Sequence, residues 1–205
     1  MKQKLLVLGK MQENGYVIWD EGSLRGILID PGDDAEKIEW FLEKEGIQPE
    51  AILLTHGHFD HIMAADALRT RYGIPVIIGE KDQALIEDEK KNLGITYIGK
   101  AVSLKADRTV KDGDRLDFIF TIHVLDTPGH SPGSVCYYIP EEERVFSGDT
   151  LFLQSIGRTE SKAEFDTLIR SIRTKLFTLP DATRVYPGHG FPTQIGREKE
   201  TNPFL

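Results

Sequence analysis

Four potential metal ligands fall within six residues in the stretch Thr55-His56-Gly57-His58-Phe59-Asp60-His61. The apolar run at 51–54 directly before it predicts a buried strand, and the glycine between the first two histidines predicts a loop. Imidazole and carboxylate groups are typical ligands of zinc and of several other transition metals. One tetrahedral site rarely takes four ligands from a single tight turn. This density of potential ligands therefore indicates two metals, each of which takes its remaining ligands from elsewhere in the chain.

Three further loops present ligand-type residues beside glycine. His130, Asp149 and His189 each lie in a turn that contains glycine and follows a predicted strand. Loops on a rigid scaffold are where binding sites are usually built. A single histidine in such a loop would ordinarily be a surface residue, but five of the six histidines occupy these junctions. The sixth, His123, alternates as a strand residue should, and it is predicted to be structural or exposed.

The hydrophobic pattern predicts two β-rich halves with helices attached and no linker between them. This arrangement favours a single domain over residues 1–205, in which sheets pack on each other and helices cover the outside. Residues 92–107 show no clear period and receive no assignment. Strands are predicted at 5–8, 16–19, 26–29, 51–54, 74–78, 116–120, 122–125, 134–139, 144–146 and 183–186, helices at 35–45, 62–72 and 162–177, and partial helix at 81–91.

Composition excludes several classes of partner and site. The formal net charge of −8 repels polyanions, so nucleic acid is not an expected partner. The only cysteine, Cys136, excludes an internal disulfide, and its apolar surroundings predict a buried strand residue and not a nucleophile. No segment approaches the roughly 20 apolar residues that cross a bilayer, and the N-terminal apolar run is too short for a signal peptide. We therefore expect no membrane association and a cytoplasmic location.

The ligand-bearing segments resemble those of a known family. The stretch 55–61 matches the His-x-His-x-Asp-His signature of the metallo-β-lactamase superfamily, and His130, Asp149 and His189 match its later motifs in order. Segments 127–134, 147–152 and 157–159 look most like the glyoxalase II-like branch, the hydroxyacylglutathione hydrolases. The resemblance implies a mixed α/β (α+β) fold, a four-layer αββα sandwich with its site at one edge of the two sheets.

The same resemblance assigns ligands to two divalent metal ions. It places His56, His58 and His130 on one metal and Asp60, His61 and His189 on the other, with Asp149 as the bridge. Zn²⁺ is the expected metal, and iron or manganese would accept the same ligands. Asp30 is a candidate for orienting a ligand imidazole, or else an ordinary turn aspartate. Arg158 is a candidate for pairing with a substrate carboxylate, or else a surface arginine.

The implied reaction is hydrolysis of a small hydroxyacyl thioester of the hydroxyacylglutathione type by a hydroxide that bridges the two metals. Asp60 and Asp149 are the candidate catalytic residues, since either can accept a proton, although both would also be ligands. The chain ends soon after His189. Full-length glyoxalase II carries a C-terminal helical extension there that helps to bind glutathione, so glutathione recognition stays open.

Other activities on this fold are alternatives. A persulfide dioxygenase with a single iron resembles the chain closely, and a lactonase is a further possibility. A β-lactamase is disfavoured because that branch has a cysteine ligand and lacks the histidine at position 61. Nuclease members generally carry extra domains for polynucleotide. A non-catalytic metal-binding protein is disfavoured because all seven ligand positions are filled. The sequence does not predict the oligomeric state.

Overall fold

Two six-stranded mixed sheets form the centre of the structure, a computed structural model that describes all residues 1–205. The first sheet has the order β1-β2-β3-β4-β5-β6 and the second β14-β13-β10-β9-β8-β7. The strands are β1 (Lys2–Leu8), β2 (Glu13–Trp19), β3 (Arg25–Ile29), β4 (Gln48–Leu54), β5 (Val76–Gly79), β6 (Arg108–Val110), β7 (Arg115–Asp117), β8 (Thr121–Asp126), β9 (Val135–Ile139), β10 (Arg144–Gly148), β13 (Arg184–Pro187) and β14 (Thr193–Gln194), with a small hairpin of β11 (Leu151–Phe152) and β12 (Ser155–Ile156).

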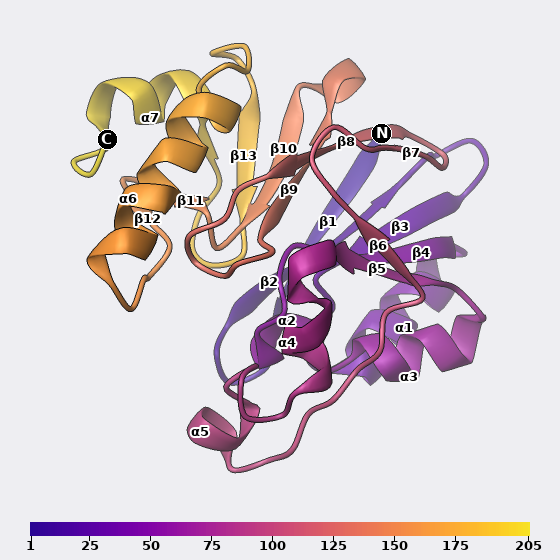
Figure 1. Cartoon of the computed structure of the whole chain (residues 1–205). Coiled ribbons are helices and arrows are strands. Elements are labelled where there is room, and N and C mark those ends of the chain that lie inside the picture. Colours follow the sequence, from indigo (N-terminus) through magenta and orange to yellow (C-terminus); the bar gives the residue numbers. More distant parts are fainter.

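Helices lie on the outer face of each sheet (Figure 1). The longer ones are α1 (Ala35–Glu45) and α3 (Ala65–Tyr72) on the first sheet, and α6 (Lys162–Ser171) on the second, which continues into a π-helical turn, η3 (Ile172–Leu176). The shorter ones are α2 (Phe59–Ile62), η1 (Glu80–Asp82), α4 (Gln83–Glu87), α5 (Gly94–Ile98), η2 (Pro140–Glu142) and α7 (Ile195–Thr201). The predicted αββα sandwich is confirmed.

Three apolar clusters hold these four layers together. The central cluster joins inward side chains of the first sheet, such as Ile18 and Leu53, to those of the second, such as Tyr137 and Phe146. A second cluster packs α1 and α3 on the first sheet, and a third packs α6 on the second. Each strand in the middle of a sheet is therefore buried on both faces, which explains why several strands read as continuous apolar runs and not as alternating ones.

The topology brings the carboxyl ends of several strands to one edge. Strands β3, β4 and β5 are parallel, and so are β10 and β13. Two backbone hydrogen bonds join the sheets at this edge: Val135 N–H donates to the carbonyl of Thr55 (2.8 Å), and Asn14 N–H donates to that of Gly188 (2.7 Å). The loops that follow β3, β4, β8, β10 and β13 consequently meet at one place.

Some predicted elements differ from those observed. The helix predicted at 62–72 begins at Ala65, and Ile62 instead ends the short helix α2, because Met63 and Ala64 donate their N–H groups to the carbonyls of Gly32 and Pro31. The strand predicted at 116–120 stops at Asp117, because residues 118–120 form the turn of the β7–β8 hairpin. Helix α5 lies in the unassigned segment, and β6, β14 and α7 were not predicted.

Other predictions agree with the structure. Helix α1 spans the predicted residues 35–45, and its buried face consists of Ile38, Phe41 and Leu42. Cys136 lies fully buried in β9, and His123 is exposed on β8. No helix is both long and apolar enough to span a bilayer.

Candidate metal centre

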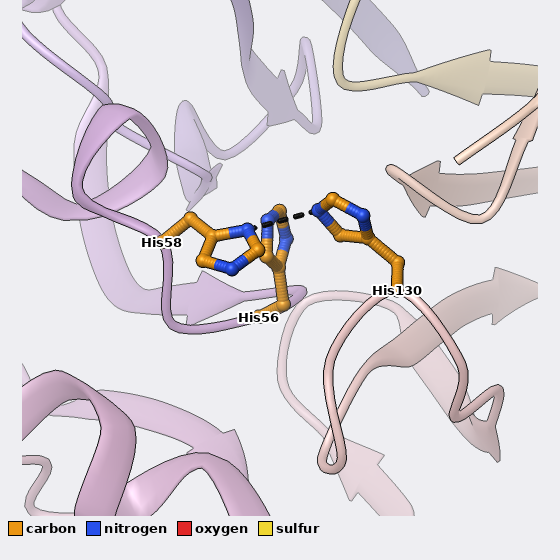
Figure 2. A group of neighbouring side chains, drawn as sticks. All are labelled: His56, His58 and His130. Carbon is orange, nitrogen blue, oxygen red and sulfur yellow. Dashed lines mark hydrogen bonds between the residues drawn. The ribbon is translucent and has the colours of Figure 1, made fainter. Parts of the chain in front are cut away.

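His56, His58 and His130 form the first group of potential ligands (Figure 2). His56 and His58 lie in the loop after β4, and His130 comes from the loop between β8 and β9. Nδ1 of His58 lies 2.9 Å from Nε2 of His130. On its other side the His130 ring is fixed, because Nδ1 lies 2.7 Å from the carbonyl oxygen of Arg158. A proton on Nδ1 would leave Nε2 as the free lone pair that faces the other two histidines.

Asp60, His61 and His189 form the second group. Nε2 of His189 lies 3.3 Å from Oδ2 of Asp60, and Nε2 of His61 lies 4.0 Å from the same oxygen. Asp60 and His61 belong to the short helix α2, while His189 follows β13. A side chain at Gly188 would collide with Asp149 and His61, since its Cβ would lie 2.4 Å from Oδ1 of Asp149. Glycine at this position therefore lets the His189 loop approach the second group.

Asp149, directly after β10, faces both groups. Its Oδ1 lies 3.5 Å from Nε2 of His61, and its Oδ2 lies 3.7 Å from Nε2 of His130 and 3.7 Å from Nε2 of His189. The structure thus brings all seven predicted ligand residues together, with one carboxylate between the two groups. The sixth histidine, His123, lies outside this cluster.

Asp30 connects two of the ligand residues, His61 directly and His56 through Thr55. It is buried, and its carboxylate accepts hydrogen bonds from the backbone N–H of Thr55 (2.7 Å) and the Thr55 hydroxyl (2.6 Å). Its Oδ2 also lies 3.0 Å from Nδ1 of His61, and Oγ1 of Thr55 lies 3.1 Å from Nδ1 of His56. Asp30 adopts a left-handed backbone conformation (φ 46°), which aspartate tolerates better than most residues. Its carboxylate is therefore in position to orient the imidazoles of His56 and His61.

Several ligand atoms are buried without a hydrogen-bond partner. These atoms are Nε2 of His56, Nε2 of His61 and Oδ1 of Asp149. Buried polar atoms are nearly always satisfied in folded proteins, so each such atom needs an explanation. Lone pairs of two imidazoles and one carboxylate within 4.8 Å of one another suit a divalent metal, and the donor set accepts zinc, iron or manganese. The residues present therefore fit the predicted metals.

Burial and neighbouring charges affect the two groups in opposite ways. Burial, reinforced by the neighbouring histidines, lowers the pKa of His56 well below its ordinary value and that of His58 to about 4. Burial also opposes a charge on His61 and His189, but nearby carboxylates outweigh it and raise the pKa of both. Burial likewise works against ionised Asp60, yet His61 and His189 hold its pKa below the usual range. Without metal, these shifts favour neutral imidazoles at His56 and His58, whereas they favour ion pairs of Asp60 with His61 and His189.

A cavity of about 400 Å³ opens onto both groups. Besides ligand residues, its lining includes Met11, Lys91, Tyr97 and Arg158. The exposed Arg158 guanidinium is paired with Glu160 and donates to the Tyr97 hydroxyl (2.9 Å). Arg158 therefore lies at the rim of the site, and the predicted contact with a substrate carboxylate stays a prediction.

Sequence reasoning missed several residues that support the site. Asn14 donates through Nδ2 to the carbonyls of Pro187 (3.0 Å) and Gly190 (2.9 Å), and so holds the His189 loop. Glu13 is buried with both carboxylate oxygens unpartnered, 3.8 Å from Nδ1 of His61, and burial raises its pKa well above the ordinary value. Nothing in the sequence around them marked either residue, because their partners lie far away in the chain.

Comparison with known proteins gives the family. The family model described as the metallo-beta-lactamase superfamily matches residues 8–189. The chain belongs to this superfamily.

Relatives in the superfamily carry different descriptions. YqgX of Bacillus subtilis, described as a probable metallo-hydrolase, is 39% identical over 100% of this chain and 98% of its own length. The Haemophilus influenzae hydroxyacylglutathione hydrolase GloC is 36% identical with the same coverage of both chains.

The solved structures that resemble this chain also carry different descriptions. A protein named BLEG-1, described as a B3 metallo-beta-lactamase, is 42% identical, with a TM-score of 0.95 over 100% of this chain and 99% of its own. TTHA1623 in a di-iron-bound form is 42% identical, with a TM-score of 0.83 over 98% and 100% of the two chains. ETHE1 from Myxococcus xanthus is 31% identical, with a TM-score of 0.80 over 99% of this chain and 84% of its own.

Proposed function

We propose that this protein is a binuclear metal-dependent hydrolase of the glyoxalase II-like branch that cleaves small hydroxyacyl thioesters. The observation that carries the proposal is the position of Asp149 between two groups of three ligand residues at the floor of one cavity. The likeness to GloC, a hydroxyacylglutathione hydrolase, supports the choice of a thioester.

The proposed ligands divide as the two groups do. His56, His58 and His130 would hold one metal, Asp60, His61 and His189 the other, and Asp149 would contact both. Divalent metals bound here would lower the pKa of water toward neutrality and polarise a substrate carbonyl. The loops deliver these seven side chains from strand ends that the two sheets hold rigidly, so the ligand atoms are close together before any metal binds.

The chain's own residues would bind and orient the substrate. Arg158 and Lys91 line the cavity, where they are paired with Glu160 and Asp88, and we propose that a substrate carboxylate replaces one of these acidic partners. The Tyr97 ring stacks on Phe59, with centroids 6.0 Å apart, and offers an apolar wall to the substrate. Asp60 and Asp149 are the carboxylates in the cavity lining that belong to the proposed ligand set, and we propose that one of them accepts the proton released in hydrolysis.

A second candidate function rests on two of the solved structures. The likeness to ETHE1 and to a di-iron form of TTHA1623 favours iron chemistry, and a persulfide dioxygenase-like activity is the alternative that we retain. A lactonase of the same fold also stays an alternative. The likeness to BLEG-1 adds β-lactams to the compounds to be tested, although the sequence disfavours a β-lactamase.

Metal analysis and substrate turnover together distinguish these candidates. Protein purified without added metal is analysed for zinc, iron and manganese. The metal-loaded protein is then assayed with lactoylglutathione, a lactone, a β-lactam, and glutathione persulfide under oxygen. Our proposal predicts two metals per chain and fastest turnover of the thioester. Metal-loaded protein that leaves the thioester intact would contradict it, and oxygen uptake with persulfide on a single iron would establish the alternative.

A further inference from the structure

Asp82 is a fully buried aspartate outside the ligand set. It ends η1, the 3-10 turn that follows β5 in the first sheet. Its side chain has no solvent exposure, and no lysine or arginine forms an ion pair with it. A buried carboxylate without a positive partner is costly unless hydrogen bonds satisfy it, so its partners indicate why it is there.

Every partner of the Asp82 carboxylate belongs to one of two ligand-bearing loops. Oδ2 accepts from the backbone N–H of Gly57 (2.9 Å), the residue between His56 and His58. Oδ2 also accepts from the hydroxyl of Ser131 (2.6 Å), directly after His130, and Oδ1 accepts from the backbone N–H of Gly133 (2.6 Å). One side chain therefore binds the loop after β4 of the first sheet and the loop before β9 of the second.

Close backbone packing reinforces this connection. A Cβ at Gly133 would lie 2.3 Å from the backbone nitrogen of Asp82, and one at Gly79 would lie 2.1 Å from the Gly133 carbonyl oxygen. The loop before β9 and the junction of β5 with η1 can approach this closely only because both positions lack a side chain. Ser131 is held in turn by Ser134, whose Oγ lies 2.6 Å from that of Ser131.

We propose that Asp82 is a positioning residue that fixes the distance between the His56–His58 loop and the His130 loop, and so assembles the three-histidine ligand group. The inference rests on the proposed ligand assignment. It concerns only one of the two groups, because Asp82 makes no contact with Asp60, His61 or His189. Loss of the carboxylate should loosen the first group and leave the second intact.

The substitution Asp82→Asn tests this with little change in volume. An amide has a single acceptor oxygen, so in either orientation its NH₂ faces Gly57 N–H or Gly133 N–H, and that buried donor loses its acceptor. Residues that position metal ligands typically change metal affinity by about 10- to 100-fold when altered. We expect a loss of that size for the first group. Asp107→Asn is the control for the same chemical change away from the site, because the half-exposed Asp107 accepts from Val76 N–H (2.9 Å) at the opposite end of β5 and pairs with Arg69.

Two variants, each lacking one ligand, allow metal binding to be measured separately at the two ligand groups. Apo-protein carrying His189→Ala keeps the three-histidine group, and apo-protein carrying His58→Ala keeps the other. Each is titrated with Zn²⁺ by calorimetry and with Co²⁺ by visible absorption, with and without Asp82→Asn. We expect weaker binding only in the His189→Ala background and no change with Asp107→Asn. Near-ultraviolet circular dichroism verifies that each variant is folded.

The outcomes separate the positioning role from the ligand assignment. Unchanged affinity in the His189→Ala background, or equal losses in both backgrounds, would overturn the role of Asp82. Wild-type protein that binds no metal would overturn the ligand assignment and the inference with it. If Asp82→Asn does not fold, Ser131→Ala removes one of the three contacts, and the same selective but smaller loss is expected.

Discussion

The substitution Asp30→Asn addresses whether a buried carboxylate orients the ligand imidazoles. Asp30 accepts from Thr55 N–H, the Thr55 hydroxyl and His61 Nδ1, at 2.7, 2.6 and 3.0 Å. Asparagine fits the same left-handed backbone conformation, so the change removes charge and one acceptor oxygen without adding backbone strain. If the amide oxygen keeps the Thr55 hydroxyl and His61, the NH₂ must face Thr55 N–H.

The structure sets the size of the expected effect. A hydrogen bond to a charged group contributes about 1.5–3 kcal/mol. In Asp30→Asn the bond from Thr55 N–H is lost, and the bonds from the Thr55 hydroxyl and His61 are weakened because the acceptor is no longer charged. We expect the free energy of unfolding of the metal-free protein to fall by about 2–4 kcal/mol, against a total of about 5–15 kcal/mol for a typical domain. The variant should therefore still fold. Metal affinity at the group containing His61 should fall by about 10- to 100-fold.

Urea unfolding of metal-free protein and calorimetric titration with Zn²⁺ measure the two effects. Asp34→Asn is the control, because Asp34 is exposed, has φ 50°, and its carboxylate accepts a single hydrogen bond, from Gly9 N–H (3.0 Å). Its effect on unfolding should stay within about 0.5 kcal/mol. If Asp30→Asn lowers stability but leaves metal affinity unchanged, Asp30 is only structural. If neither quantity changes, the reasoning from its hydrogen bonds is wrong.

Three further predictions follow from the site and the core. Asp149→Ala should lower thioesterase activity by about 100-fold or more and reduce bound metal, measured by elemental analysis; full metal content with normal turnover would exclude a shared ligand. Arg158→Ala should raise KM for a carboxylated thioester by about tenfold with kcat unchanged, since one charge-assisted contact is lost; equal KM values would make Arg158 a surface residue. Burial raises the pKa of Cys136 to about 11, so the native protein at about pH 8 should resist a thiol reagent and react once unfolded; rapid labelling of native protein would contradict its burial.

The ligand residues could be predicted from the sequence because their chemistry and their local setting coincide. Histidine and aspartate in glycine-containing turns after apolar runs indicated strand ends, and parallel strands bring such ends to one edge. The outer helices could also be predicted, since Ile38, Phe41 and Leu42 of α1 show the spacing of one buried helix face. These features depend on residues that are near one another in the chain.

The missed features depend on contacts between distant residues. Asp82 lies within the charged segment 81–91, where an aspartate ordinarily faces solvent, yet its partners Ser131 and Gly133 lie about fifty residues away. The break between α2 and α3 is comparable, because Gly32 and Pro31 supply the acceptors that draw Met63 and Ala64 out of the helix. Residues 116–120 were predicted as one strand, but residues 118–120 close a hairpin, since the register ends at Asp117 and Thr121.

The division of ligands between the sheets explains why these supporting residues are buried and polar. Each proposed metal takes two ligands from loops of the first sheet and one from a loop of the second, and Asp149 also comes from the second. Neither half contains a complete set, so metal affinity depends on how firmly the halves are joined at this edge. Apolar packing determines how far apart the two sheets lie, but it does not determine how two loops are placed relative to each other. A hydrogen bond has a preferred distance and direction, so it determines both the separation and the relative placement. Carboxylates and amides that reach across the interface, such as Asp82 and Asn14, can therefore determine the geometry of ligands that they do not touch.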